Sequence, residues 1–170
     1  MSAFGSDSTT DDVLDGTDLT GVGVVVTGTS AGLGVETARA LSAHGADVVG
    51  VVRDIDKARR NLDAVGATGV ELYEADLADL GSIRAFANAF DADGHDHVDV
   101  VIANAGIMAC PEGRTTDGFE LQFGTNHLGH FLLTNRLLPQ LTAAPQGRVV
   151  VVASGSYKQA PAAGIEFDNL

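Results

Sequence analysis

The stretch VVVTGTSAGLGVETARAL, residues Val24–Leu41, passes from a run of β-branched residues through three glycines into helix-forming sequence. β-branched residues favour a strand, and glycine allows the tight turn that ends one. We predict a strand that stops at Gly28, a loop through Gly32 and Gly34, and a helix that starts there. A helix start with bare backbone presents free N–H groups and a positive dipole end, which together bind phosphate. The stretch therefore predicts a pyrophosphate-binding turn.

The spacing of these glycines, T-G-x-x-x-G-x-G over Thr27–Gly34, differs from the common dinucleotide pattern G-x-G-x-x-G. An alternative interpretation is a glycine-rich connection that binds no ligand. The strand expected before it and the helix expected after it favour the binding role.

Length and composition indicate one globular domain, because 170 residues with 45% hydrophobic content can bury a core. No apolar run approaches the ~18 residues that cross a bilayer, and the N-terminal stretch is acidic where a secretory signal is basic and apolar. We therefore expect a cytoplasmic protein. The single cysteine, Cys110, excludes an internal disulfide and is too little for a thiolate metal site.

Acidic residues dominate the charge, with 23 Asp and Glu against 10 Lys and Arg and a net charge of −13. Such a surface repels nucleic-acid phosphates and anionic lipids, so we expect neither nucleic acid nor membrane as a partner. Solubility is one explanation for the acidity. The composition also resembles that of halophilic proteins, in which high salt screens self-repulsion.

After a polar extension, residues 1–19 with a short helix near Asp11–Leu14, β-branched runs alternate with segments of helical period. The strands, each apolar enough to be buried on both faces, are predicted at Val22–Thr27, Asp47–Val52, Val70–Glu74, Val98–Ala103 and Arg148–Ala153. Helices are predicted over Ile55–Val65, Leu80–Phe90 and Thr116–Leu141, the last with Pro139 as a stop signal. This alternation predicts an α/β fold over residues 20–170: a doubly wound parallel sheet, or Rossmann fold, with ligands at the carboxyl ends of the strands.

Three motifs resemble the short-chain dehydrogenase/reductase family: TGTSAGLG at Thr27–Gly34, NAG at Asn104–Gly106 and NHLGHFLLTNRLLP at Asn126–Pro139. The longer string FELQFGTNHLGHFLLT is especially similar to the retinol-dehydrogenase-like branch. The resemblance covers Leu19–Leu170. It implies an NAD(P)-dependent oxidoreductase that transfers hydride between the nicotinamide and a carbonyl or alcohol substrate.

The choice of dinucleotide depends on the residue about 20 positions after the glycine turn, an acid for the ribose 2′-hydroxyl or an arginine for a 2′-phosphate. The second predicted strand ends at Val52 and Arg53. By resemblance, Val52 stands where NAD-binding relatives carry Asp, and Arg53 where NADP-binding relatives carry a base. We predict NADP over NAD. The alternative is that Arg53 is a solvated cation that pairs with Asp54 or Asp56.

Further coenzyme contacts are implied by the resemblance. Asp76 and Leu77 would flank the adenine, and Asn104–Gly106 would pack on the coenzyme, although Asp76 could equally be the N-cap of the next helix. The complete predicted coenzyme set is Thr27, Gly28, Ser30, Gly32, Leu33, Gly34, Arg53, Asp76, Leu77, Asn104, Ala105 and Gly106.

Hydride transfer needs a proton donor and a hydroxyl placed at the developing oxyanion. The resemblance assigns this hydroxyl to Ser154, with Ser156 as its rival, and a role in the proton relay to Asn126, which could instead be an interhelical hydrogen bonder. The family's donor is a tyrosine followed by a lysine four residues later, whose ammonium lowers the pKa of the phenol. Tyr157 and Lys158 are adjacent, about 100° apart on a helix, so they do not form this pair.

In the branch that this sequence resembles, an insertion separates the serine from Tyr-x-x-x-Lys, and GIEFDNL at Gly164–Leu170 resembles the middle of that insertion. We expect the fold to be incomplete at its C-terminal end and the Thr116–Leu141 helix to have an apolar face free for association, such as a homo-oligomer. Three functions stay open: the coenzyme-binding part of an oxidoreductase, a dinucleotide-binding module without catalysis, and an interaction module.

Histidines give weaker signals. His127 and His130 would share a helix face, and His95 and His97 lie in one turn, but neither pair has a third ligand at suitable spacing. We therefore predict no metal site. Cys110 has no evident base and is predicted to be structural.

Overall fold

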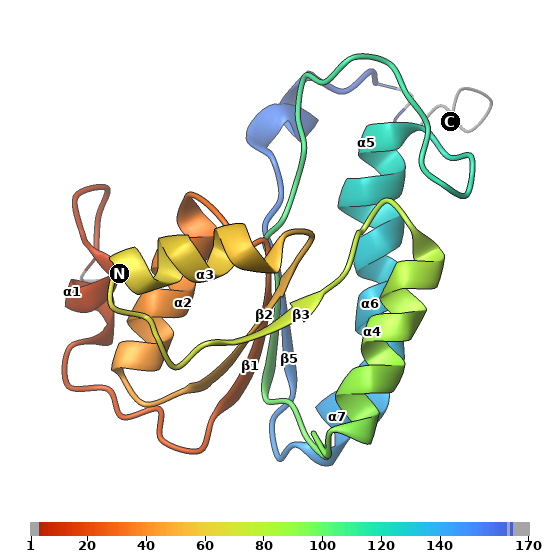
Figure 1. Ribbon diagram of the computed structural model, residues 1–170. Helices are drawn as coiled ribbons and strands as arrows, with labels where there is room; N and C mark the ends of the chain where they lie inside the picture. Colours follow the sequence, from red (N-terminus) through yellow and green to blue (C-terminus); the bar gives the residue numbers. More distant parts are fainter. Residues whose placement is uncertain (1–3, 163, 165–170) are drawn as a thin grey trace.

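Five parallel strands form the central sheet of the computed structural model, which describes residues 4–162 and 164. The strands, in chain order, are β1 (Gly23–Thr27), β2 (Asp47–Val52), β3 (Glu71–Glu74), β4 (Val100–Ala103) and β5 (Arg148–Val151). Their order in space is β3-β2-β1-β4-β5 (Figure 1). The chain first builds outward from β1 to β3 and then returns to the other side of β1. The predicted doubly wound sheet is thus confirmed, with its switch point between β1 and β4.

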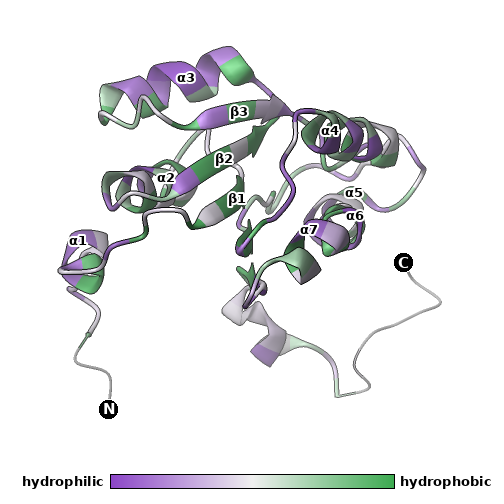
Figure 2. Ribbon diagram, turned by 90° about the horizontal axis from the view of Figure 1, so that it is seen from below, coloured by the Kyte–Doolittle hydropathy of each residue, from purple (hydrophilic) through white to green (hydrophobic). Residues whose placement is uncertain are grey.

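Helices cover both faces of this sheet (Figures 1 and 2). On one face lie α2 (Leu33–Ala43) and α3 (Ile55–Ala64), with α1 (Thr10–Leu14) beside α2. The other face carries α4 (Leu80–Ala92), α5 (Leu121–Phe123), the π-helix η1 (Gly124–Gly129), α6 (His130–Arg136) and α7 (Leu138–Ala143). A 3₁₀-helix, η2 (Gly155–Gln159), follows β5. No helix in the described part of the chain is both long enough and apolar enough to cross a membrane.

The strand side chains alternate between two apolar cores, one on each face. Val24 and Val26 pack toward α2 and α3 in one core, whereas Val25 packs in the other, toward α4, α6 and α7. Val25 is opposite Val49 of β2 and Val101 of β4, so three valines form one row across the sheet. Burial on both faces stabilises the central strands by roughly 25 cal/mol per Å² of apolar surface.

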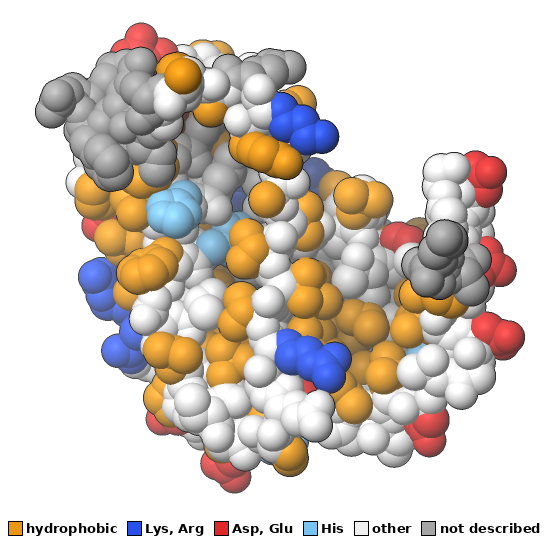
Figure 3. Space-filling model, turned by 180° about the vertical axis from the view of Figure 1, so that it is seen from behind, with side chains coloured by type: hydrophobic (Ala, Val, Ile, Leu, Met, Phe, Trp, Pro, Cys, Tyr) orange, Lys and Arg blue, Asp and Glu red, His pale blue; other side chains and the backbone are white. Residues whose placement is uncertain are grey.

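The edge strands depart from the prediction that every strand is buried on both faces. In β3, Glu71 and Glu74 are exposed. In β5, Val149, Val150 and Val151 are 43%, 46% and 64% exposed. The prediction is wrong for these two strands because each has a sheet neighbour on one side only in the described chain. Figure 3, which looks onto the β5 edge, shows hydrophobic side chains gathered over the middle of this face.

The predicted single helix over Thr116–Leu141 is also wrong. The helical segment begins later, at Leu121, because the Glu120 carboxylate accepts the backbone N–H groups of Gln122 and Phe123 at 2.9 and 2.6 Å. It widens into η1 and breaks at Leu137. Pro139 does not end the segment but lies in the first turn of α7, where the N–H that proline lacks has no partner in any case.

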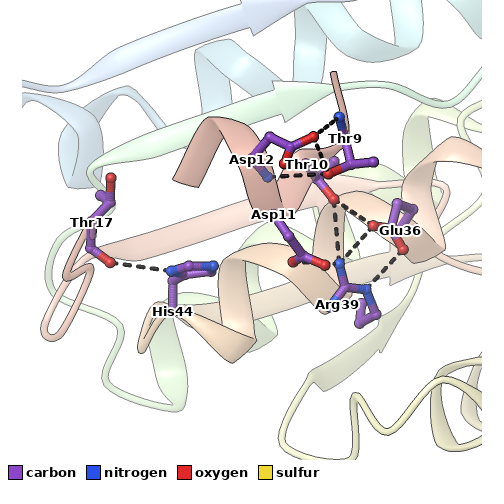
Figure 4. A network of polar contacts seen from close by, with 8 residues as sticks. All are labelled: Thr9, Thr10, Asp11, Asp12, Thr17, Glu36, Arg39 and His44. Atoms are coloured by element: carbon purple, nitrogen blue, oxygen red, sulfur yellow. Dashed lines mark hydrogen bonds and ion pairs between the residues drawn. The ribbon is translucent and has the colours of Figure 1, made fainter. Parts of the chain in front are cut away.

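The N-terminal extension is tied to α2 by a polar network (Figure 4). Arg39 of α2 contacts Asp11 at 2.8 Å and Glu36 at 2.7 Å, and the Thr10 hydroxyl donates to the same Glu36 carboxylate. Hydrogen bonds from Arg39 and from Thr10 lower the pKa of Glu36 to about 2. At the other end of α2, the His44 ring bonds the Thr17 carbonyl oxygen at 3.2 Å. The extension therefore packs on the α2 surface, and its last residue, Leu19, packs against the core on that face of the sheet.

Candidate functional site

A cavity of about 410 Å³ opens at the carboxyl ends of β1 to β4. Ten of the twelve predicted coenzyme residues line it, together with Lys57, Ile107 and Thr125: the ten are Gly28, Ser30, Leu33, Gly34, Arg53, Asp76, Leu77, Asn104, Ala105 and Gly106. The other two do not line the cavity: Thr27 is fully buried, and Gly32 is the N-cap of α2. The sheet order thus gathers residues from four separate loops around one space.

Close backbone approach explains the glycines of the β1–α2 turn. Gly28 has a φ of +79°, and a Cβ there would meet Ala105 at 3.0 Å. A Cβ at Gly34 would lie 2.8 Å from both the Gly28 carbonyl carbon and the Asn104 amide nitrogen. The turn is anchored from α3 by Asn61, whose amide donates to the Ser30 carbonyl oxygen at 2.7 Å. These contacts hold the first amides of α2 at the edge of the cavity.

Thr27 and Asn104 join the end of β1 to the loop after β4. The Thr27 hydroxyl oxygen accepts the backbone N–H groups of Asn104 and Ala105, each at 3.0 Å. In return the Asn104 amide donates to the Thr27 carbonyl oxygen at 2.9 Å. The NAG sequence therefore forms the cavity wall through backbone bonds that Thr27 fixes.

Two cations lie at the end of β2. Arg53 and Lys57 are both exposed and both line the cavity. Within the described residues Arg53 makes no ion pair with Asp54 or Asp56; instead, Asp54 caps α3 by accepting the Lys57 backbone N–H at 2.8 Å. Lys57 was not among the residues predicted from the sequence. Its spacing of four residues from Arg53, in the first turn of a helix that directly follows the strand, is the signal that would have found it.

Asp76 lines the cavity and is not the N-cap of the next helix. Its carboxylate accepts the Ala78 backbone N–H at 2.9 Å, which closes a tight turn. Asp79 caps α4 by accepting the N–H groups of Gly81 and Ser82 at 2.7 and 3.1 Å. The alternative of Asp76 as a helix cap is therefore wrong, because the cap falls three residues later.

Thr125 and Asn126 are neighbours in the π-helix η1, and Thr125 faces the same cavity. Thr125 lines it, is 7% exposed, and has a hydroxyl that finds no hydrogen-bond partner in the described chain. Asn126 clasps the backbone of Ile107: its side-chain oxygen accepts the Ile107 N–H at 2.9 Å, and its amide donates to the Ile107 carbonyl at 2.8 Å. Asn126 thus binds a loop and not another helix. No sequence pattern pointed to Thr125, because its place at the cavity depends on how the π-helix η1 packs in the fold.

His130 is buried next to this loop, with 6% exposure. Its Nε2 lies 2.8 Å from the Thr27 hydroxyl oxygen, and its Nδ1 lies 2.9 Å from the Asn126 carbonyl oxygen. Burial lowers the pKa of His130, and a smaller contribution in the same direction comes from His127. His127 itself is exposed and stacks on Phe123, so the prediction that the two histidines share a face is wrong. The wide turn of η1 separates them.

Ser154 lies outside the cavity lining. It follows β5 and begins η2, where its hydroxyl oxygen accepts the Ser156 backbone N–H at 3.1 Å and its hydroxyl donates to that of Ser156 at 2.9 Å. Tyr157 is 72% exposed. The structure therefore does not bring Ser154, Ser156 or Tyr157 to the residues around the glycine turn.

A second cleft, of about 450 Å³, lies at the opposite, amino ends of β1 to β3. His95 lines it, stacks on Phe90 and contacts the Tyr73 hydroxyl at 3.1 Å. Ligands of parallel sheets bind at the carboxyl ends, so the first cavity is the candidate site although it is the smaller one. Among the described residues, no group of three or more His, Cys, Asp or Glu side chains is arranged to hold a metal. Cys110 is half-buried.

Comparisons with known proteins agree with this geometry. A family model described as short chain dehydrogenase matches residues 23–166. Retinol dehydrogenase 11 of Homo sapiens is 46% identical over 156 residues, which are 89% of this chain and 48% of that protein. Retinol dehydrogenase 13 of Homo sapiens is 43% identical, over 86% of this chain and 44% of that protein. The chain spans about half the length of the curated relatives it matches.

Solved structures are also similar to this chain. An uncharacterized protein from Mycobacterium Paratuberculosis aligns with a TM-score of 0.71 and 48% identity, over 82% of this chain and 48% of that one. The complex of Pseudomonas aeruginosa RhlG with NADP at its active site aligns with a TM-score of 0.65 and 28% identity, over 78% of this chain and 54% of that one.

Proposed function

Because the chain belongs to the short-chain dehydrogenase family, we propose that its cavity binds NADP(H) and that it supplies the coenzyme-binding part of an oxidoreductase. The bound nicotinamide would exchange a hydride with a carbonyl or alcohol carbon of the substrate. The name of the retinol dehydrogenase relatives makes alcohols and their aldehydes the first substrate class to test.

The glycine turn fits a pyrophosphate group. Gly28 and Gly34 leave no side chain between the backbone and the cavity, and α2 begins at the cavity edge with Leu33. Backbone N–H groups and the helix dipole would hold the two phosphate charges. Asn61 keeps the turn in place from behind through the Ser30 carbonyl.

The pair Arg53 and Lys57 carries the choice of NADP. The two residues place positive charge at one edge of the cavity, although the whole chain has a net charge of −13. A ribose 2′-phosphate is a doubly charged group that both cations would attract, whereas the 2′-hydroxyl of NAD offers them no charge. The apolar Val52, where an acid would bind the NAD ribose, supports the same choice. The NADP complex of the RhlG relative is consistent with it.

Other predicted residues would contact the remaining parts of the coenzyme or hold the loops beside it. Asp76 and Leu77 would border the adenine, and Thr125 would offer its unpartnered hydroxyl to the ligand. An unpaired buried hydroxyl is unfavourable by about 1–3 kcal/mol, so a ligand atom that bonds it adds affinity. Asn126 would hold the loop at Ile107 beside the nicotinamide end. We keep Ser154 as the proposed oxyanion-side hydroxyl.

The placement of the predicted catalytic side chains favours a second function, a dinucleotide-binding module without turnover. Ser154 is exposed and outside the cavity lining, and the adjacent Tyr157 and Lys158 lack the spacing of the family pair. Under this proposal the coenzyme binds but no substrate is reduced or oxidised. Cytoplasmic location and salt dependence remain predictions from composition, and an interaction role remains a prediction from the expected apolar helix face.

Fluorescence titration of the 170-residue chain with NADPH, and calorimetric titration with NADP and NAD, test the proposal. We expect tighter binding of NADP than of NAD. Arg53→Gln and Lys57→Gln should each weaken NADP binding by roughly 5–30-fold, on the order of 1–2 kcal/mol for an exposed cation near a phosphate, and leave NAD binding unchanged. Arg59→Gln is the matched control, because Arg59 lies on α3 with Lys57 but does not line the cavity.

The outcomes separate the candidates. Equal affinity for NADP and NAD removes the assigned role of Arg53 and Lys57, and no binding of either removes the coenzyme function. If NADPH binds, its oxidation in the presence of aldehydes and ketones supports the oxidoreductase. Binding without any oxidation selects the module.

A further inference from the structure

We infer that His130 is a positioning residue for the coenzyme cavity: its imidazole locks the end of β1, the Asn104–Ile107 loop and the π-turn at Asn126 into one hydrogen-bonded circuit. The inference rests on the proposed coenzyme role of the cavity. His130 itself does not line that cavity. It acts on the lining residues through Thr27 and Asn126.

Hydrogen bonds close the circuit through four segments. The Thr27 hydroxyl oxygen holds the N–H groups of Asn104 and Ala105 at 3.0 Å. Further along this loop, both polar backbone atoms of Ile107 bond the Asn126 side chain at 2.9 and 2.8 Å. The His130 ring then returns from the Asn126 carbonyl oxygen, at 2.9 Å, to the Thr27 hydroxyl, at 2.8 Å.

The partners of the ring fix its tautomer. The Asn126 carbonyl oxygen can only accept, so Nδ1 of His130 carries the proton and donates. The Thr27 oxygen already accepts two N–H groups, and its own proton needs an acceptor. Nε2 of the neutral ring is 2.8 Å away, whereas the alternative acceptor, the Ile102 carbonyl oxygen, is 3.5 Å away. Thr27 therefore donates to Nε2.

A protonated ring would break this order. Both ring nitrogens of an imidazolium donate, so Nε2 would present a third N–H to a Thr27 oxygen that already accepts two. The hydroxyl proton would then lose its acceptor. His127, in η1 just before α6, makes a further small contribution that lowers the pKa of His130. The neutral Nδ1–H ring is thus the form that satisfies every donor and acceptor of the circuit.

The circuit matters for binding because its members form the cavity wall. Asn104, Ala105 and Ile107 line the cavity, and Thr125 precedes the carbonyl-bearing Asn126 by one residue. Thr27 and His130 are 103 residues apart in the chain, so this contact is made only by tertiary packing. Without the ring, only the Asn126–Ile107 hydrogen bonds would join the loop after β4 to η1. The cavity wall would then be more mobile and would lose more conformational entropy when the coenzyme binds.

The tautomer is tested by long-range ¹H–¹⁵N spectra of the histidine rings in the 170-residue chain, which has five histidines. His130→Gln identifies the His130 signals by their loss. We expect a protonated Nδ1 and an unprotonated, hydrogen-bonded Nε2. An Nε2–H tautomer, or a charged ring at neutral pH, overturns the inference.

The positioning role is tested by NADPH titration of matched variants. His130→Leu removes both bonds of the ring, whereas His130→Gln places an amide oxygen near the Nε2 position, where it can accept from Thr27. We expect His130→Leu to weaken NADPH binding by about three- to tenfold, because only part of the free energy of the two lost bonds is felt at the cavity, and His130→Gln to recover most of it. His127→Leu, at the exposed neighbour, should bind as the unchanged protein does.

A double-mutant cycle adds a readout that simple loss of packing would not move. Thr27→Val removes the hydroxyl, and the loss of NADPH affinity in the pair Thr27→Val with His130→Leu should be smaller than the sum of the two single losses, because the Thr27–His130 bond is removed in both. The inference is overturned if a folded His130→Leu protein binds NADPH with full affinity. It is also overturned if His130→Leu and His130→Gln lose equal affinity and the losses of the double variant are additive. Absence of NADPH binding by the unchanged chain overturns the proposed function instead.

Discussion

Substitution of Gly34 by alanine tests the packing of the glycine turn on which the coenzyme proposal depends. A methyl group at Gly34 would lie 2.8 Å from the Gly28 carbonyl carbon and closer still to its oxygen, whereas ordinary contact begins at 3.4 Å. The start of α2 and the end of β1 would have to separate by at least 0.6 Å, the difference between these distances. The same methyl would lie 2.8 Å from the Asn104 amide, which holds the next loop.

Both stability and binding should fall. Overpacking of this kind is unfavourable by typically about 1–3 kcal/mol, which lowers the Tm of a chain of this size by roughly 2–12 °C. The displaced amides of α2 would also misalign with a bound pyrophosphate. Loss of one charge-assisted hydrogen bond, about 1.5–3 kcal/mol, would weaken NADPH binding by roughly 10–150-fold.

Thermal unfolding followed by circular dichroism measures the first effect, and fluorescence titration with NADPH measures the second. Gly155→Ala is the control, because a Cβ at Gly155 meets nothing within 4 Å. If Gly34→Ala matched this control in both Tm and affinity, the close approach of Gly28 to α2 would be refuted, and with it the backbone cradle for phosphate.

Three further outcomes are expected. The lowered pKa of Glu36, about 2, implies stability that is present above its ordinary value of 4.5 and is lost as the pH falls toward 2; Glu36→Gln should flatten this acid limb in urea unfolding, by less than about 1 kcal/mol because the pair is partly exposed. The lowered pKa of His130 implies stability that is complete above pH 6.5 and declines as the pH falls below it, because the unfolded chain takes up the proton first; urea unfolding of His130→Gln from pH 8 to 5 should show a weaker decline. Val151, 64% exposed on β5, should promote self-association, so Val151→Lys should lower the mass seen by sedimentation at high protein concentration, and no change would clear this edge of that role.

Local patterns predicted the central strands well. The bounds of β2 agree with the prediction residue for residue, and β1 differs only by Val22. Runs of valine ended by glycine or by a charged residue are a local signal, and burial on both faces makes it a strong one. The family resemblance is confirmed as well, because the TGTSAGLG, NAG and NHLGHFLLT motifs fall within the matched residues 23–166.

The helical segment after Thr116 is a feature that local sequence patterns did not predict correctly. Its apolar period continues through Asn126 and His130, so a single long helix is the natural prediction. The π-turn arises from contacts with distant residues: Asn126 clasps Ile107, and Gly129 approaches Leu77 so closely that a Cβ would lie 3.0 Å from the Leu77 side chain. Helical period alone carries no information about these partners.

The edge strands and Lys57 were misjudged for a related reason. A valine run indicates that a strand is apolar, but only the neighbours in space decide whether Val151 is covered. Likewise, Lys57 reads as an ordinary helix cation until the placement of α3 brings it to the cavity edge. Burial and proximity are properties of the assembled sheet.

The sequence by itself determined the strand, the glycine turn and the helix that follow one another from Val24 to Leu41, because backbone conformation there is set by consecutive residues. Only the tertiary structure decided that Arg53, Asp76, Asn104 and Thr125 face one cavity, because that depends on the strand order β3-β2-β1-β4. The physical reason is distance along the chain: a turn is closed by neighbours, whereas the cavity is closed by hydrogen bonds such as that between Thr27 and His130, which form only when the sheet and its helices pack together.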